Sequence, residues 1–325
     1  MSRAWWLAKR LVVAIAVVYA IVTVVFLFVA LTKDPTIHMV ERAAVIGGLS
    51  GEEVDAVLEA YRESRNRDDP PLQRYVNWLI NVATLDWGRS FSTGQPVAPL
   101  IGRGLLFTGA YLVPALGLAV GGGIAIGMYS ATHDGSIGAR ISVGLSYFGF
   151  GVPNFLFAWL LMWFVSVELG LFGRGLSDVA GVWSWQTAGN MGLAAIVAGS
   201  SILAGQIRYA RAASLEQLGR EFVKLLRAKG AGPRTVTRHV LRNAAGPIVS
   251  TAFTELIDVM LLGIIVIELI FGIPGIGHLI HQGVVQRDLP LLMGAAMVLA
   301  FLTVGGTFLQ DVLRGSLDPR VSHDD

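Results

Sequence analysis

The fold of this chain is decided by the stretch Leu226-Arg-Ala-Lys-Gly-Ala-Gly-Pro-Arg-Thr-Val-Thr-Arg-His-Val-Leu-Arg-Asn-Ala-Ala-Gly-Pro247. It is basic, it has the pattern of two helices joined by a short turn, and it lies between apolar runs long enough to cross a bilayer. Gly230 is placed to close the first helix with a left-handed cap, and Pro233 suits the first turn of the second helix. A membrane protein that keeps such a hairpin between two spans is expected to offer it to a partner.

The residues around this stretch define the hairpin further. Ser214 and Gln217 match a capping box, which predicts that the first helix begins there, and the second helix is expected to end near Leu241. Apolar residues of the first helix fall on one stripe: Leu215, Leu218, Phe222 and Leu225. A basic amphipathic hairpin fits both a loop held at the anionic inner leaflet and a docking element for a cytosolic protein, and the pattern favours docking.

Composition places the chain in the membrane and excludes several chemistries. Of its 325 residues 54% are hydrophobic and only 15% charged, with a mean hydropathy of +0.61, whereas a soluble domain carries about 25% charged residues. Cysteine is absent, which excludes disulfides, cysteine-based zinc sites and thiol nucleophiles. No Gly-Lys dipeptide occurs, so the chain has no P-loop. If it moves a solute at the expense of ATP, the ATPase must be another polypeptide, and this chain is not itself an enzyme.

Six long uncharged runs predict six membrane spans. The first run, of about 33 Å as a helix, is too long for a signal peptide and no small-residue cleavage site ends it, so it is expected to remain as a span. The runs cover residues 11–32, 104–131, 141–167, a part of 179–207 that is most apolar from Met191, 246–270 and 289–310.

The basic residues orient these spans. Six spans place both termini on one side, together with the 2–3 loop and the 4–5 loop. These segments hold 15 of the 25 Lys and Arg: three before the first span, one in the 2–3 loop, nine in the 4–5 loop and two in the tail, one of them Arg320. The two short outer loops hold one each, Arg174 and Arg287, and the long segment 33–103 weighs little in such counts. Both termini are therefore predicted to be cytosolic.

The long segment between the first two spans has a helical pattern of its own. Ser50-Gly-Glu-Glu53 matches a capping box, in which the Ser50 hydroxyl accepts from the N3 amide and Glu53 reaches back. A polar helix is expected to follow to about Arg65 and to break at 68–71. Apolar residues at helical spacing then predict a second helix over 72–82. A small folded extracytosolic insertion is expected.

Two patterns suggest chemistry that their surroundings do not support. Gly48-Leu-Ser-Gly51 matches a signature of intramembrane serine proteases, but that chemistry needs the serine on a helix within the membrane beside a histidine base, and Ser50 lies in a polar loop. His278 and His281 suggest a metal pair, but a third ligand and a His-Glu-x-x-His pattern are absent, so a hydrogen-bonded interfacial pair is favoured. Neither a catalytic nor a metal site is predicted.

Ordered motifs along most of the chain resemble one family. Arg227-Ala-Lys-Gly230, Arg238-His-Val-Leu-Arg-Asn243 and Pro247 resemble the cytosolic loop of binding-protein-dependent ABC importer permeases, in the dipeptide/oligopeptide/nickel branch. Further matching motifs are Tyr75-Val-Asn-Trp-Leu79, Trp87-Gly-Arg-Ser-Phe-Ser-Thr-Gly-Gln-Pro-Val97, Val152-Pro-Asn-Phe155, Glu268-Leu-Ile-Phe-Gly-Ile-Pro-Gly-Ile-Gly277, Arg287-Asp-Leu-Pro290 and Leu317-Asp-Pro-Arg320.

This resemblance implies an all-α polytopic membrane protein with the type I importer permease fold, six transmembrane helices and cytosolic termini. Residues 1–32 then form the cytosolic N-terminus and first span, 33–103 the extracytosolic insertion between helices 1 and 2, and 104–325 the permease core with the cytosolic coupling loop 208–245. The chain would be one subunit of an importer in a prokaryotic cell membrane and form half of the pathway. Peptides are the first expectation for the solute, while relatives also carry nickel chelates and sugars.

The resemblance also implies the partners. These are a second related permease, two cytosolic ATPase subunits that bind the ATP and Mg, an extracytosolic solute-binding protein on the outer face including 271–287, and membrane lipid; no cofactor bound by this chain and no nucleic acid are expected. The helices around Gly230 would sit in a groove of the ATPase. The residues implied in this coupling are Glu221, Lys224, Arg227, Ala228, Lys229, Gly230, Arg234 and Arg238. Leu225 and Leu226 stand where the family usually has a small residue, so the partner's groove is expected to differ.

Glu255 and Asp258 lie within the fifth predicted span, at i and i+3 on one helix face, where the family usually has apolar or small residues. Acids at that depth are costly and face protein or water. Two hypotheses remain open: they line the pathway and favour a cationic group, or they bond polar groups of neighbouring spans or of the partner permease. A rival function is an ion-coupled secondary transporter in which they carry protons, but the inverted repeat that it predicts is not found. A purely structural anchor would leave the hairpin without a purpose.

One further group belongs to the segment Glu268–Gly277. Glu268 matches the family pattern near the outer end of its span, and Pro274, Gly275 and Gly277 follow it. An outer gate or a structural role is expected for these four residues.

Overall fold

The computed structural model describes residues 3–31, 35–64, 69–171 and 184–317. Within these ranges every regular element is a helix, and the one β contact is an isolated bridge between Arg89 and Pro96. The elements are α1 (Arg3–Leu31), α2 (Pro35–Ile46), α3 (Gly51–Ser64), α4 (Pro71–Ala83), α5 (Val97–Thr132), α6 (Ile137–Gly151), α7 (Asn154–Trp163), η1 (Phe164–Glu168), α8 (Trp185–Leu218), α9 (Glu221–Ala228), α10 (Pro233–Asp258), η2 (Val259–Gly263), α11 (Ile264–Phe271), α12 (Ile276–Val285) and α13 (Leu289–Leu317).

Five of the described helices are long and apolar enough to cross a membrane: α1, α5, α8, α10 and α13. Two further pairs reach that length only together. α6 and α7 with η1 are bent by 96° at their break, and α11 and α12 are bent by 89°. An all-helical, multi-pass membrane protein is therefore confirmed.

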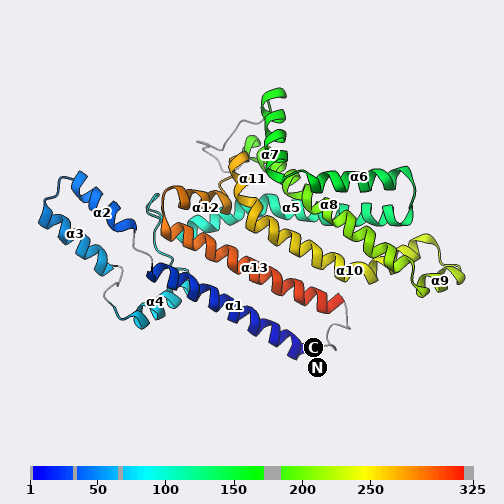
Figure 1. Cartoon of the computed structure of the whole chain (residues 1–325), viewed down its shortest axis with the longest axis horizontal. Coiled ribbons are helices and arrows are strands. Elements are labelled where there is room, and N and C mark those ends of the chain that lie inside the picture. Colours follow the sequence, from blue (N-terminus) through cyan, green and yellow to red (C-terminus); the bar gives the residue numbers. More distant parts are fainter. Residues whose placement is uncertain (1–2, 32–34, 65–68, 172–183, 318–325) are drawn as a thin grey trace.

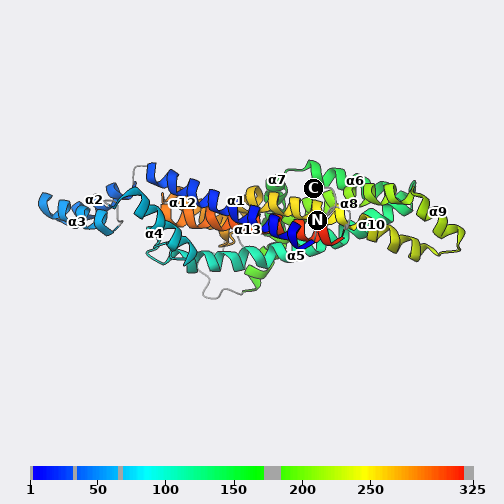
Figure 2. The ribbon, with the colours of Figure 1, turned by 90° about the horizontal axis from the view of Figure 1, so that it is seen from below.

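The long helices run side by side along the long axis of the molecule (Figure 1). α1 lies against α13, α13 against α10, α10 against α8, and α8 against α5 and α6. Seen from below, they form a thin slab with α2 and α3 at one end and α9 at the other (Figure 2). Arg10 of α1 pairs with Asp311 of α13 at 3.3 Å, so the first turns of α1 and the last turns of α13 lie together.

The centre of the slab is the contact between α5 and α8. Small side chains face each other there and are almost fully buried, among them Ala115, Ala119, Ala194 and Ala198. Small residues let two helix backbones approach closely, which supplies the packing contacts that hold membrane helices together. This contact fixes the frame to which α10, α11 and α12 attach.

The described part of the insertion contains three helices before α5, of which two were predicted. α3 begins at the expected capping box and α4 covers the expected second helix, whereas α2 was not predicted. The Ser50 amide and hydroxyl both donate to the Glu53 carboxylate at 2.8 Å. These two hydrogen bonds, the one from the amide most of all, lower the pKa of Glu53. The Ser50 hydroxyl was predicted to accept a hydrogen bond from the N3 amide, but it donates one to the Glu53 carboxylate instead. α4 packs on α1, where the Trp78 indole donates to the Val22 carbonyl at 3.2 Å.

Three helix predictions were wrong. The third run is not one helix, because Pro153 disfavours helix at Val152 and α6 ends at Gly151. The predicted capping box at Ser214 does not start a helix: α8 continues to Leu218 and Ser214 is fully buried within it. The second hairpin helix does not end near Leu241, since α10 continues through Pro247 to Asp258. Predictions that lie outside the described residues concern Thr32, Lys33, Arg65, Asp68, Arg174, Val179 and Arg320.

Candidate functional site

The hairpin formed by α9 and the start of α10 lies at one end of the molecule (Figure 1). α8 ends at Leu218, α9 follows from Glu221, and α10 begins at Pro233. Val223 of α9 is fully buried in a small apolar cluster with Met128 of α5 and with Val236 and Val240 of α10. The predicted stripe fails at Leu225, which is 56% exposed, because the helix restarts at Glu221 and turns Val223 inward. α9 is thereby packed firmly against α10.

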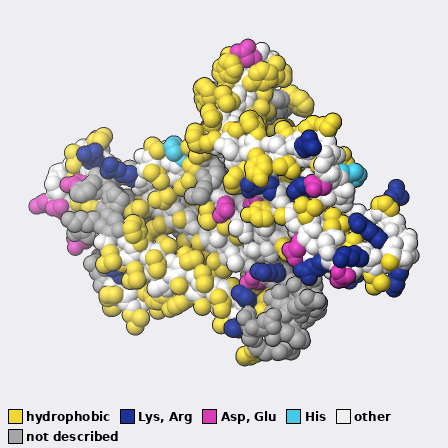
Figure 3. Space-filling model, turned by 45° about the vertical axis from the view of Figure 1, so that its right-hand side comes forward, with side chains coloured by type: hydrophobic (Ala, Val, Ile, Leu, Met, Phe, Trp, Pro, Cys, Tyr) yellow, Lys and Arg dark blue, Asp and Glu magenta, His cyan; other side chains and the backbone are white. Residues whose placement is uncertain are grey.

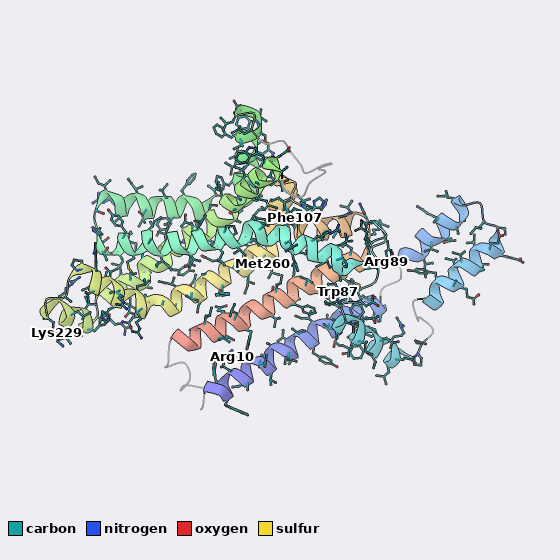
Figure 4. The ribbon with its side chains drawn as sticks, turned by 180° about the vertical axis from the view of Figure 1, so that it is seen from behind. Arg10, Trp87, Arg89, Phe107, Lys229 and Met260 are labelled. Atoms are coloured by element: carbon teal, nitrogen blue, oxygen red, sulfur yellow. The ribbon has the colours of Figure 1, made fainter. Side chains whose placement is uncertain are left out.

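The turn after α9 has the predicted left-handed glycine. Gly230 has a φ of +79°, and the amides of Gly230 and Ala231 donate to the carbonyls of Arg227 and Leu226, each at 3.0 Å. Lys229 lies at the tip of the hairpin (Figure 4). Pro233 occupies the first turn of α10, as predicted.

The eight residues predicted for coupling lie together at this end, and all of them are exposed. Figure 3 shows Lys and Arg side chains gathered on the part of the surface that includes α9. Glu221 and Lys224 pair with each other at 2.8 Å. Charged side chains that project from a helix held by a buried apolar cluster can contact a partner without losing their support. α10 is 26 residues long, about 39 Å at 1.5 Å per residue, so it can carry a displacement of α9 deep into the slab.

The far end of α10 borders a cleft of about 330 Å³. The break between α6 and α7, the middle of α8, and the π-helical turn η2 form its walls. Its lining residues are Phe150, Asn154, Phe155, Ser201, Ile202, Glu255, Asp258, Val259, Gly263, Val266 and Ile267. Both candidate pathway acids thus face the same cleft, and Asn154, whose amide nitrogen donates to the Ser201 hydroxyl at 3.2 Å, connects two of its walls.

The two acids differ in their surroundings. Glu255 accepts a hydrogen bond from the Gln206 side chain of α8 at 2.9 Å, and its carboxylate lies directly over Gly205, where any Cβ would collide with it. Asp258 is exposed in the cleft and makes no hydrogen bond or ion pair with a described residue. Glu255 lines the cleft, as the pathway hypothesis expects, and it also bonds a neighbouring helix, as the alternative hypothesis expects. Asp258 lines the same cleft and has a carboxylate available to a ligand.

A third acid, Glu268, lies at the bend between α11 and α12 and is fully buried. Thr108 and Tyr111 of α5 donate to its Oε1 at 2.6 and 3.2 Å, and the His278 amide donates to its Oε2 at 2.9 Å. The Thr108 hydroxyl in turn accepts from the Ile276 amide at 2.9 Å. One carboxylate therefore joins α5, α11 and the start of α12.

The glycines after Glu268 make this bend possible. A Cβ at Gly275 would overlap the Glu268 carboxylate, and one at Gly277 would lie 2.6 Å from the backbone nitrogen of Ile265. Pro274 lies in the bend directly before Gly275. All four residues lie at this tight bend beside the slab, and the Glu268 carboxylate is the clamp that joins its segments.

The histidine prediction was wrong. His278 Nδ1 is buried without a hydrogen-bond partner, and His281 is exposed, so the two do not form the expected hydrogen-bonded pair. The His278 backbone amide, not its ring, takes part in the clamp. Among the described residues no group of three or more His, Asp or Glu is arranged to hold a metal ion.

Asp288, which belongs to the motif Arg287-Asp-Leu-Pro290, was not among the predicted site residues. Asp288, between α12 and α13, is fully buried and accepts from the Ser90 hydroxyl at 2.6 Å and from the Ser92 amide and hydroxyl at 2.9 and 2.8 Å. Burial alone would raise the pKa of Asp288, but these bonds and one from the Leu291 amide lower it. The loop that carries Trp87 and Arg89 lies at this end of the slab, away from Lys229 (Figure 4). Nothing in the sequence pairs serines with an acid almost 200 residues away.

The chain is similar to known membrane transport proteins. Residues 123–323 match the family model of the binding-protein-dependent transport system inner membrane component. The oligopeptide transport system permease protein AppB of Bacillus subtilis is 33% identical over 82% of this chain and 85% of its own length. The dipeptide transport system permease protein DppB of the same species is 30% identical over 84% and 85%. The metal-staphylopine import system permease protein CntB of Staphylococcus aureus is 28% identical over 97% of both chains.

A solved structure shares the fold. The MetNI methionine ABC transporter in an inward-facing conformation matches 67% of this chain and 96% of its own chain, with a TM-score of 0.53 at 20% sequence identity. At that identity the match concerns the fold. The third of this chain that it leaves unmatched is consistent with extra structure around a common permease core.

Proposed function

This chain belongs to the family of binding-protein-dependent transport system inner membrane components, and we propose that it forms half of the pathway of an ATP-driven importer of short peptides. As a member, it is a multi-pass permease subunit of an ABC importer, a transport component and not an enzyme, and it works with ATPase and solute-binding components. The ion-coupled secondary transporter is not supported. Peptides are proposed because AppB and DppB, which are similar along most of their length, are named for oligopeptide and dipeptide transport.

The proposed arrangement in the membrane has six spans with both termini and α9 in the cytosol. In it α6 with α7 forms the bent third span, and α10 with α11 forms the fifth, so α12 returns along the outer face. Two observations support this arrangement: the basic residues concentrate in the segments assigned to the cytosol, and the start of α1 lies beside the end of α13. The insertion and the Asp288 turn then face the solute-binding protein.

The observation that carries the proposed mechanism is the exposed, firmly packed helix α9 joined to the continuous helix α10. We infer that the eight coupling residues contact one of two ATPase subunits, which bind the ATP and Mg. Closure of the ATPase pair would push α9, and α10 would move the wall of the cleft that contains Glu255. α6 and α7 line one side of the cleft, and a second, related permease would supply the other half of the pathway.

Within the pathway, Glu255 and Asp258 would meet the ammonium group of the peptide. Opposite charges a few Å apart attract far more strongly in a partly dry cleft than in water. Asp258 is available for this contact, while the Gln206 bond orients Glu255 toward the same cleft. No cofactor bound by this chain is needed for this role.

The experiment is uptake of a radiolabelled dipeptide into vesicles that contain the whole transporter. Glu255→Gln with Asp258→Asn is expected to lower uptake about tenfold or more, because each variant keeps the shape of the side chain and removes its charge. Glu59→Gln, an exposed position on α3, is the control and should leave uptake unchanged. Unchanged uptake in the double variant would remove the pathway role of the acids, and no uptake of any peptide by the wild type would contradict the proposed substrate.

A further inference from the structure

From the sequence, Arg208 was placed at the start of the cytosolic loop 208–245, but in the structure it lies within the continuous helix α8, a candidate membrane span. It forms no ion pair and no hydrogen bond with a described residue. Its Nε atom is buried without a hydrogen-bond acceptor. Ionisable residues within membrane spans usually pair with each other or with backbone carbonyls and mark substrate pathways, because an unpaired charge is costly there. Arg211, one turn further along the same helix, shows the usual arrangement: it pairs with Asp134 at 2.6 Å.

The Arg208 guanidinium is held by aromatic rings. Its central carbon lies 4.0 Å from the centroid of Phe150 and 6.0 Å from that of Tyr147, both on α6. A cation over an aromatic face is attracted by the ring, and a stacked guanidinium keeps the N–H groups on its edge free to donate. The rings therefore position Arg208 without using its hydrogen-bonding capacity.

Phe150 also lines the cleft that contains Glu255 and Asp258. Arg208 is not itself among the residues that line the cleft, but its guanidinium lies against Phe150, which is. Electrostatic attraction between Arg208 and Glu255 is present, although the two do not form an ion pair. The region thus offers carboxylates on the α10 wall and an unpaired guanidinium beside the α6 wall.

We propose that Arg208 binds the C-terminal carboxylate of the transported peptide, so that the cleft selects peptides with both ends free. This inference rests on the proposed function in peptide import and adds the second end of the substrate. A carboxylate can accept two parallel N–H bonds from a guanidinium, which fixes orientation as well as charge. A volume of about 330 Å³ lies at the lower end of the range of small-molecule sites, as expected for a site that takes a short peptide.

The test measures binding of a radiolabelled dipeptide to the purified complex of permease and ATPase in nanodiscs, without the solute-binding protein. The wild type is expected to bind the free dipeptide about tenfold or more tightly than the same dipeptide with an amidated C-terminus, since a charge-assisted bidentate contact is lost on amidation. Arg208→Gln should weaken binding of the free dipeptide to the level of the amide and leave the amide unchanged. Arg208→Lys should give an intermediate preference, and Arg140→Gln, exposed on the same α6, should behave as wild type.

Each other outcome overturns the inference. Equal wild-type affinity for both dipeptides would show that the carboxylate is not recognised. An equal loss of both in Arg208→Gln would show that Arg208 pairs with the second permease or only maintains structure. A preference that appears in zwitterionic lipid but is lost in anionic lipid would assign Arg208 to a lipid phosphate. Peptide uptake by the whole transporter, measured separately, distinguishes these failures from a failure of the proposed function.

Discussion

The two ends of the permease treat charge in opposite ways. At the α9 end charged residues such as Lys224 and Lys229 are exposed, and the buried support is the apolar cluster around Val223. At the end that carries the α11–α12 bend and the α12–α13 turn, Glu268 and Asp288 are fully buried. Hydrogen bonds from Thr108 to Glu268 and from Ser90 to Asp288 join separate segments there. The α9 end therefore presents charged groups to its surroundings, whereas the other end uses its buried acids to hold its own loops in a fixed shape.

The largest expected effect comes from removing the clamp. Glu268→Ala leaves Thr108, Tyr111 and the His278 amide without their shared acceptor and opens a cavity, so it should destabilise the permease by about 3 kcal/mol or more. Thermal unfolding of the purified subunit in detergent measures this loss. Glu268→Gln, which keeps the volume and one acceptor, should lose less. An unchanged unfolding temperature in Glu268→Ala would show that the clamp does not hold this end.

The second-largest effect is expected from lowering the pH, which protonates Asp288. The pKa of Asp288 is lowered in the folded protein, so its contribution to stability is present above its unfolded pKa of about 3.9 and is lost as the pH falls through the lower folded value. Hydrogen exchange over residues 86–96, corrected for intrinsic rates, should therefore accelerate below about pH 4. In Asp288→Asn the amides of residues 86–96 should already exchange faster than in the wild type at neutral pH, and their exchange should change little more as the pH falls. Equal protection of these amides in variant and wild type at neutral pH would show that Asp288 does not hold the loop of residues 86–96 in place.

A smaller effect is expected at the hairpin turn. Gly230→Ala places a side chain at φ +79°, which costs about 1 kcal/mol, and should weaken the association with the ATPase measured by co-purification. Gly232→Ala is the matched control in the same turn, because its φ is −68° and no atom lies within 4 Å of the added Cβ. If both variants co-purify equally well, the left-handed turn does not matter for coupling.

The smallest effect separates partner contact from stability. Glu221 and Lys224 form an exposed pair, and such pairs contribute little to folding. Glu221→Gln should shift the unfolding temperature of the isolated subunit by less than about 2 °C. ATP-driven uptake should nevertheless fall if Glu221 contacts the ATPase. A large drop in unfolding temperature would contradict the contrast drawn between the two ends.

The sequence by itself determined the class of the molecule and its exposed end. Long uncharged runs predicted an all-helical membrane protein because only helices satisfy backbone groups within such runs. Gly230 and Pro233 predicted their turn because their backbone preferences are local properties of those residues. The residues proposed for coupling came from the family resemblance, and they lie within 18 consecutive positions, from Glu221 to Arg238.

Only the tertiary structure decided which distant residues meet. The same rules that found a capping box at Ser50 failed at Ser214, because packing buries Ser214 inside the continuous α8. The pairing of Asp288 with Ser90, and of Arg208 with Phe150, joins residues far apart in the chain and has no local signature. Secondary structure follows from short-range preferences that a sequence displays directly, whereas these contacts depend on how the α6–α7 and α11–α12 breaks fold back against the slab.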